Sequence, residues 1–189
     1  MEIVLIRHGK PTIDLSEKMS ASGFGQRVMD YDRAGIDAEH KPTREACKRA
    51  GKCRFIVCST LPRSIESARA LNIENPDMTS DLFRECEMPY ANWKYPKLTG
   101  TSWSVLFRIL QLMGYTSHTE SYKAIKHRAQ KCTDQLVELS QKHGSVLFIG
   151  HGAIIWLIHK RLLRMKWSGP QKSVRDYWAF GVYTKNTTG

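Results

Sequence analysis

The chain has 189 residues, of which 41% are hydrophobic and 25% are charged. These values suit one globular domain covering residues 1–189, and we find no repeat, low-complexity tract or linker that would divide it. The formal net charge of +11 favours anionic partners, but the charges are dispersed along the chain and do not identify one.

Cysteine usage and the lack of long apolar runs indicate the expected compartment. The five cysteines are odd in number and include no CxxC pair, which argues against a disulfide framework and against a zinc site. The N-terminus lacks the basic start and apolar stretch of a signal peptide, and the longest apolar run, residues 153–158, is too short to span a bilayer. We therefore expect a cytoplasmic protein with reduced thiols, no metal and no membrane association.

The first predicted strand, residues 2–6, is a short apolar run that leads into Arg7-His8-Gly9. A histidine at the carboxyl end of a strand can project into a cleft, where neutral imidazole is a competent nucleophile toward phosphorus. The arginine fork matches phosphate oxygens, and glycine lets the backbone pass close to a bound group. Alone, this tripeptide is a weak signal, because a lone histidine is more often structural. The next expected elements are a loop at 16–25 and helices at about 26–36 and 43–50.

The second predicted strand, residues 54–58, leads into Ser59-Thr60-Leu61-Pro62-Arg63 and a helix at about 62–71. Proline suits the first turn of a helix. Arg63 lies beside the free backbone N–H groups of that turn, a combination that favours an anion site, although a surface arginine is the alternative. The next expected elements are a loop at 87–100 and a helix at about 102–113.

The third predicted strand, residues 145–149, follows a long amphipathic helix at about 120–142 and ends in Gly150-His151-Gly152. His151 at this junction could donate a hydrogen bond to phosphate, carry positive charge against it, or serve as a buried structural histidine. The last expected elements are a helix at about 153–163 and a strand near the sheet edge at 176–184. Ligands bind at the carboxyl ends of strands in open α/β sheets, so two histidines and two arginines would meet if the three strands adjoin.

These three segments resemble, in order, the motifs of the histidine phosphatase superfamily, also called phosphoglycerate mutase-like. The resemblance implies an α/β three-layer sandwich with a mostly parallel sheet and helices on both faces. It implies that His8 accepts the phosphoryl group and that Arg7, Arg63 and His151 bind it, with His151 also acting in catalysis. The family uses a carboxylic acid to protonate the leaving oxygen. The candidate is Glu85 in Leu82-Phe83-Arg84-Glu85, with Glu87 as the alternative.

The chain departs from the family pattern at several positions. Lys10-Pro11 replaces the pair that commonly follows Arg-His-Gly, and Asp14 stands where many members place asparagine. Residues 86–118 are not recognisable in detail and lie where the family inserts a variable cap over the site. Lys10, Trp93 and Lys97 are candidates for substrate contact, although each could equally belong to ordinary packing or to the solvated surface.

The function that the resemblance implies is hydrolysis of phosphate monoesters through a phosphohistidine on His8, with no cofactor and no metal. The substrate would be a small phosphorylated metabolite or a phosphoprotein. A phosphomutase and a phosphohistidine-protein phosphatase are the alternatives on the same fold, and mutases of this superfamily are longer than this chain. A non-enzymatic anion-binding protein is the alternative of another class. We expect no nucleic-acid partner, since no basic stretch interleaved with aromatics is present, and the oligomeric state is left open.

Overall fold

The computed structural model describes residues 1–186, and a five-stranded sheet lies at its centre. The strand order is β4-β3-β6-β1-β7. The strands are β1 (Glu2–Arg7), β3 (Phe55–Ser59), β4 (Met78–Ser80), β6 (Ser145–Gly150) and β7 (Phe180–Thr184). Four strands run parallel, and β7 pairs antiparallel with β1 at one edge. The predicted mostly parallel sheet is therefore confirmed.

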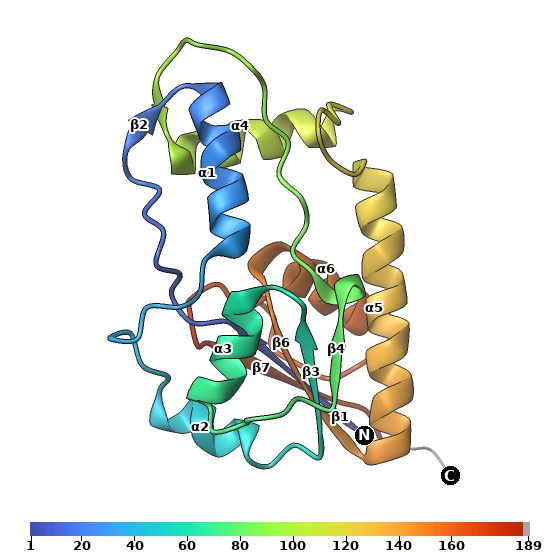
Figure 1. Ribbon diagram of the computed structural model, residues 1–189. Helices are drawn as coiled ribbons and strands as arrows, with labels where there is room; N and C mark the ends of the chain where they lie inside the picture. The colour runs from blue at the N-terminus through green and yellow to red at the C-terminus, as the bar shows by residue number, and fades with distance from the viewer. Residues whose placement is uncertain (187–189) are drawn as a thin grey trace.

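Helices cover both faces of the sheet because the central strands are apolar on both faces. Ile3 and Leu5 of β1 join one buried cluster, while Val4 and Ile6 join the other, as the two-residue period of a strand requires. α5 (Tyr122–His143) and α6 (Gly152–Arg164) pack on the first cluster. α2 (Arg44–Ala50) and α3 (Pro62–Ala70) pack on the second. Figure 1 shows the resulting three layers.

A further pair of helices lies beyond the carboxyl end of the sheet (Figure 1). α1 (Ala21–Arg33) and α4 (Gly100–Leu112) pack around their own apolar cluster. The Phe107 ring lies 5.7 Å from the Phe24 ring and 5.3 Å from the Trp103 ring. A small antiparallel pair, β2 (Lys18–Met19) and β5 (Leu98–Thr99), joins the segments that lead into the two helices. We refer to α1 and α4 together as the α1–α4 pair.

The prediction of a loop over residues 16–25 is wrong in its second half, because α1 begins at Ala21. The Ser20 hydroxyl caps this helix by accepting a hydrogen bond from the Gly23 N–H at 3.1 Å. Glycines disfavour helix, which is why this segment resembles a loop in the sequence. Gly25 has a packing role instead, since a Cβ at this position would lie 2.4 Å from the Tyr90 ring.

Both edges of the sheet differ from what the sequence predicted. The expected strand within 176–184 covers only Phe180–Thr184, because residues 175–178 turn aside to contact Arg7. β4 was not predicted, since its three residues form no apolar run and become a strand by pairing with Val57–Ser59 of β3. A 3-10 turn, Asp81–Phe83, then carries the chain toward Glu85.

The register of the parallel strands places the three predicted motifs side by side. Arg7 of β1 pairs with Gly150 of β6, and Cys58 of β3 pairs with Ile149 of β6. His8 and His151 therefore leave adjacent strands at the same level, as expected of residues at the carboxyl edge of a parallel sheet. Among residues 1–186, no helix is both long and apolar enough to cross a membrane.

Candidate active site

His8 lies directly after β1 and is 1% exposed. Its Nδ1 atom lies 2.7 Å from the Gly9 carbonyl oxygen. Because a carbonyl only accepts hydrogen bonds, Nδ1 carries the proton and Nε2 keeps its lone pair. Burial, followed by the positive charge of Arg63, lowers the pKa of His8 to about 3. The imidazole is therefore neutral at physiological pH, with an unprotonated nitrogen.

The backbone after His8 is fixed by α3 and by the segment before β7. The Gly9 N–H donates to the Ser67 hydroxyl at 2.9 Å, and that hydroxyl donates to the Arg63 carbonyl at 2.6 Å. A Cβ on Gly9 would lie 2.4 Å from the Trp178 ring. Glycine is required here because the backbone passes close to the Trp178 ring. The sequence had suggested a different reason, namely close approach of the backbone to a bound group.

Arg7 is held by residues 175–178, which the sequence did not single out as functional. Its guanidinium lies over the Tyr177 ring, 4.4 Å from the centroid, and donates a hydrogen bond to the Arg175 carbonyl. The Trp178 N–H donates to the Arg7 carbonyl at 3.1 Å. In the sequence, this segment is marked only by the aromatic pair Tyr177-Trp178 before the edge strand, and such pairs commonly serve hydrophobic packing.

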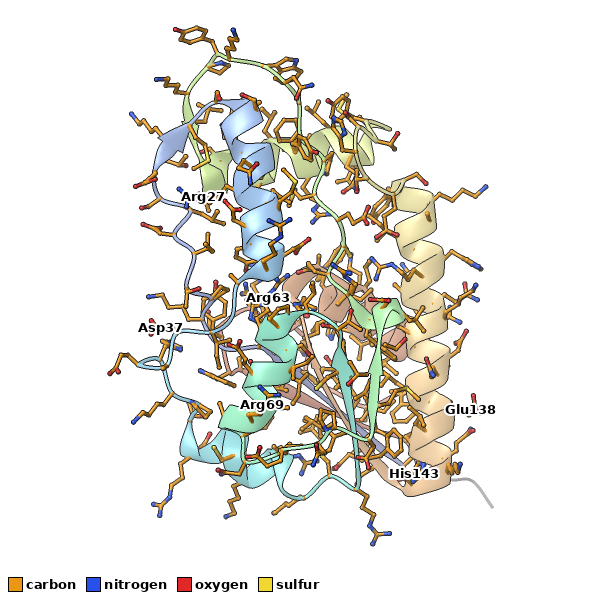
Figure 2. The ribbon with its side chains drawn as sticks, in the orientation of Figure 1. Arg27, Asp37, Arg63, Arg69, Glu138 and His143 are labelled. Atoms are coloured by element: carbon orange, nitrogen blue, oxygen red, sulfur yellow. The ribbon has the colours of Figure 1, made fainter. Side chains whose placement is uncertain are left out.

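Arg63 is fully buried in the first turn of α3 and meets the end of α1, as Figure 2 shows. Its guanidinium donates to the Tyr31 carbonyl at 2.8 Å and forms an ion pair with the Asp32 carboxylate at 3.3 Å. The Tyr31 ring also stacks on it, with the guanidinium carbon 4.6 Å from the centroid. These partners come from a helix about thirty residues earlier in the chain, so local sequence reasoning did not find them.

His151 is fully buried at the junction of β6 and α6, beside His8. The centroids of the two imidazole rings lie 5.0 Å apart. A hydrogen bond of 2.6 Å joins its Nε2 atom to the Ser59 hydroxyl at the end of β3. Burial, followed by the charge of Arg63, lowers the pKa of His151 well below its usual value. Of the roles considered from the sequence, a neutral hydrogen-bonding histidine therefore fits the geometry better than a cation.

Glu85 and Glu87 face different partners. The Glu85 carboxylate accepts hydrogen bonds from the N–H groups of Ala153 at 3.2 Å and Ile154 at 3.1 Å, in the first turn of α6. It also accepts from the Cys86 N–H at 2.8 Å. Glu87 instead accepts from the Glu120 N–H, at 2.9 Å. Glu85 is thus the carboxylate fixed to the helix that follows His151.

Three buried side-chain nitrogens at this site have no hydrogen-bond partner within residues 1–186: Nε of Arg7, Nε of Arg63 and Nδ1 of His151. Buried polar groups in folded proteins nearly always have partners. Two of the three belong to guanidinium groups, whose N–H donors match the oxygens of phosphate. The unpaired groups therefore fit a site for a bound oxyanion.

A cavity of about 510 Å³ adjoins Arg63 and Glu85 and extends beneath the α1–α4 pair. It is lined by both apolar and charged side chains: Leu15, Phe24, Val28, Tyr31, Asp32, Leu61, Arg63, Asp81, Arg84, Glu85, Cys86, Glu87, Met88, Ser104, Arg108, Glu120 and Arg128. A volume of this size accommodates a small organic ligand.

The three residues expected to contact substrate do not line this cavity. Lys10 lies 3.8 Å from the Asp37 carboxylate and is 55% exposed. Trp93 packs against the Trp103 and Phe107 rings, at centroid distances of 6.4 Å and 5.9 Å, and Lys97 is exposed. Within residues 1–186, no group of three or more His, Cys, Asp or Glu side chains is arranged to hold a metal ion.

The motifs at this site match a known family. The family model of the histidine phosphatase superfamily, branch 1, covers residues 3–182. The chain belongs to this superfamily. The resemblance read from the three sequence motifs is thereby confirmed. No curated protein sequence matches the chain.

Solved structures with the same fold include three proteins whose names describe phosphatases, and each shares at most 20% sequence identity with this chain. A protein from Escherichia coli K-12, proposed to be an α-ribazole-5'-P phosphatase, has a TM-score of 0.64 and 15% identity, over 98% of this chain and 91% of that chain. A mycobacterial glucosyl-3-phosphoglycerate phosphatase has a TM-score of 0.56 and 20% identity, over 86% and 79%. The ecdysone phosphate phosphatase of Bombyx mori has a TM-score of 0.55 and 16% identity, over 96% and 88%.

Proposed function

We propose that this protein hydrolyses phosphate monoesters through a phosphohistidine formed on Nε2 of His8. The observation that carries the proposal is a neutral imidazole with a free nitrogen, beside buried side-chain nitrogens that have no hydrogen-bond partner among residues 1–186. A neutral histidine can attack phosphorus, and fixed donors can stabilise the charge that develops on the phosphoryl oxygens. A protein that only binds anions would need no unprotonated nitrogen beside those donors.

The first chemical step transfers the phosphoryl group to His8. Nε2 attacks phosphorus, the bond to the ester oxygen breaks, and its electron pair leaves with that oxygen. Glu85 gives the oxygen a proton, so that an alcohol departs. Arg7, Arg63 and His151 donate hydrogen bonds to the phosphoryl oxygens and stabilise the transition state.

The second step releases the phosphoryl group to water. Glu85, now a carboxylate, takes a proton from the attacking water, which forms the new bond to phosphorus. The phosphorus–nitrogen bond breaks and its electron pair returns to Nε2 of His8. We assign residues 86–118, together with α1, as the cap under which the alcohol portion of a small phosphorylated metabolite binds, since the cavity lies between these segments and the sheet.

The test combines a turnover assay with a search for the intermediate. The wild-type protein should hydrolyse p-nitrophenyl phosphate and form an acid-labile phosphoenzyme on rapid quenching, because a phosphorus–nitrogen bond hydrolyses in acid. The His8→Ala variant should lose both signals, with a decrease in kcat of at least about 1000-fold. Turnover near the wild-type rate in His8→Ala would refute the scheme.

The same protein preparation distinguishes the alternatives. Isomerisation of 3-phosphoglycerate faster than hydrolysis would indicate a phosphomutase. Dephosphorylation of a phosphohistidine peptide in preference to any metabolite would indicate a phosphohistidine-protein phosphatase. Salt-sensitive anion binding without turnover of any phosphate ester would indicate a non-enzymatic binding protein.

A further inference from the structure

The cations that line the cavity are already engaged by the protein. Arg108 donates to the carbonyl oxygens of Cys86 at 3.0 Å and Glu87 at 3.1 Å, and to the Gln111 side chain at 2.7 Å. Arg63 belongs to the phosphate site and pairs with Asp32. These guanidinium groups hold the walls of the cavity and leave few donors for a second anion on the substrate.

Arg128 and Arg84 are engaged in the same way. Arg128 forms an ion pair with the Glu120 carboxylate and donates to the Arg84 carbonyl at 2.8 Å. The guanidinium of Arg84 lies 3.6 Å from the Asp81 carboxylate. Each cation on the lining therefore faces a protein carboxylate or a set of carbonyl oxygens.

The acidic side chains on the lining offset these cations. Four arginines, Arg63, Arg84, Arg108 and Arg128, line the cavity with five carboxylates, Asp32, Asp81, Glu85, Glu87 and Glu120. Because Glu85 holds a proton before the first step of the proposed reaction, four arginines then face four carboxylates, and the lining has no excess positive charge although the net charge of the chain is +11. Asp81, Arg84 and Glu87 are all exposed, but Asp81 is paired with Arg84, so a substrate group in the outer cavity would meet the Glu87 carboxylate, which forms no ion pair with an arginine of the lining.

The remaining lining is mostly apolar and comes mainly from α1 and the segments beside it. It consists of Leu15, Phe24, Val28, Leu61 and Met88, together with Tyr31, Cys86 and the polar Ser104. Among these, Leu15, Val28 and Met88 are half-buried and so retain surface that a ligand can cover. Such side chains favour a ligand that removes apolar surface from water and does not place a charge against them.

We infer that this cavity selects phosphate monoesters whose alcohol portion is uncharged and largely apolar, such as an aryl or other ring-containing alcohol, and disfavours those with a second anionic group. This inference rests on the proposed function, because it concerns the leaving group of that reaction. The single phosphoryl group is recognised by Arg7, Arg63 and His151, and the rest of the substrate meets an apolar wall and, at the rim of the cavity, the exposed Glu87 carboxylate.

The experiment compares two esters that differ by one charge: 4-carboxyphenyl phosphate and its methyl ester. The methyl ester should have a kcat/KM about tenfold higher, the discrimination expected from like charges that are partly screened by solvent. The phenol leaving groups of the two substrates differ in intrinsic reactivity. The decisive quantity is therefore the change, from wild type to variant, in the ratio of the two kcat/KM values, because the intrinsic difference cancels in that comparison.

Two variants and one matched control measure this change. Glu87→Gln removes a rim charge and keeps an oxygen that can accept from the Glu120 N–H, and it should lower the preference for the methyl ester about threefold. Val28→Lys adds a cation to the apolar wall and should shift the preference further toward 4-carboxyphenyl phosphate. Glu138→Gln removes an equally exposed carboxylate from α5, outside the cavity (Figure 2), and should leave the ratio unchanged.

The outcomes separate this inference from the proposed function. A preference for the methyl ester that decreases in Glu87→Gln and persists in Glu138→Gln supports the inference. The inference is overturned, while the phosphatase assignment stands, if the wild type hydrolyses 4-carboxyphenyl phosphate as well as or better than its methyl ester. It is also overturned if Glu87→Gln leaves the ratio of the two kcat/KM values unchanged. If neither ester is hydrolysed and no phosphoenzyme forms, the proposed function fails and the inference fails with it. Because Glu87 is exposed, Glu87→Gln gives a result even if Val28→Lys does not fold.

Discussion

Arg63 and His8 illustrate how single residues at this site depend on burial and on their partners. Arg63 has no exposed surface, yet its charge is balanced by the Asp32 carboxylate and its fork is oriented by the Tyr31 carbonyl and ring. That charge in turn helps to lower the pKa of the buried His8 imidazole. A buried arginine with two fixed supports is preorganised to bind an oxyanion, and it favours the neutral form of the adjacent His8 imidazole.

Arg63→Lys tests this arrangement at the residue scale. Lysine keeps the charge but loses the planar fork, so the variant should lose about 100- to 1000-fold in kcat with phosphate monoesters. Steady-state kinetics with p-nitrophenyl phosphate measures the loss. The control is Arg69→Lys, on the exposed side of the same helix (Figure 2), which should retain wild-type turnover. A kcat for Arg63→Lys within threefold of wild type would show that the fork has no catalytic role.

At the scale of elements, the segment that carries Glu85 has no regular secondary structure and is held by side chains from two helices. Arg128 of α5 donates to the carbonyl oxygens of Leu82 at 3.1 Å and Arg84 at 2.8 Å. Arg108 of α4 donates to the next carbonyls along the chain, those of Cys86 and Glu87. The two arginines replace the hydrogen bonds that a strand or helix would supply, so they position Glu85 against α6.

Arg128→Met should disturb this position while leaving the phosphate site in place. Good leaving groups such as p-nitrophenol need little protonation, so their kcat should fall modestly, by about threefold. Alkyl phosphates should lose about tenfold more, because their departure depends on the acid. The readout is the dependence of kcat on leaving-group basicity, which a general loss of stability would not change. Lys131→Met, at an exposed position of the same helix, is the control. An equal loss for both substrate types would assign Arg128 a purely structural role.

At the scale of the whole molecule, the burial of His8 and His151 makes the free energy of unfolding depend on pH. Burial lowers the pKa of His8 to about 3, whereas an unfolded histidine titrates near its usual value of about 6.5. Between these pH values the unfolded chain binds the proton more readily than the folded chain does. The free energy of unfolding must therefore decrease as the pH falls through this interval. His151 contributes in the same direction, since its pKa is also lowered by burial.

Urea denaturation at pH 7 and pH 4 tests this linkage. The wild type should lose stability on acidification, and His8→Gln should lose less by on the order of 3 kcal/mol, because glutamine does not titrate. The comparison uses the difference between the two proteins, which removes the shared contribution of the carboxylates. Equal losses in the two proteins would mean that His8 takes up no additional proton on unfolding.

The family resemblance implied the helices on both faces. The sequence pattern itself predicted the three central parallel strands and, on condition that those strands adjoin, the meeting of Arg7, His8, Arg63 and His151. These features depend on local information, because an apolar run followed by polar residues and glycine marks the end of a buried strand. It also supplied the superfamily through the three motifs, which the family model confirms. Short or glycine-containing elements, β4 and the start of α1, were missed because their local signal is weak or misleading.

Tertiary structure decided the features that depend on residues distant in the chain. It brought Glu85 rather than Glu87 into hydrogen-bonding contact with the first turn of α6. It also placed the Tyr31 and Tyr177 rings against the two arginines and located Lys10, Trp93 and Lys97 outside the cavity. The charge of the cavity lining is likewise set by folding, because a basic chain can still gather carboxylates where separate loops and helices meet. Local pattern determines which segments become strands and helices, whereas long-range packing determines which side chains those segments bring together.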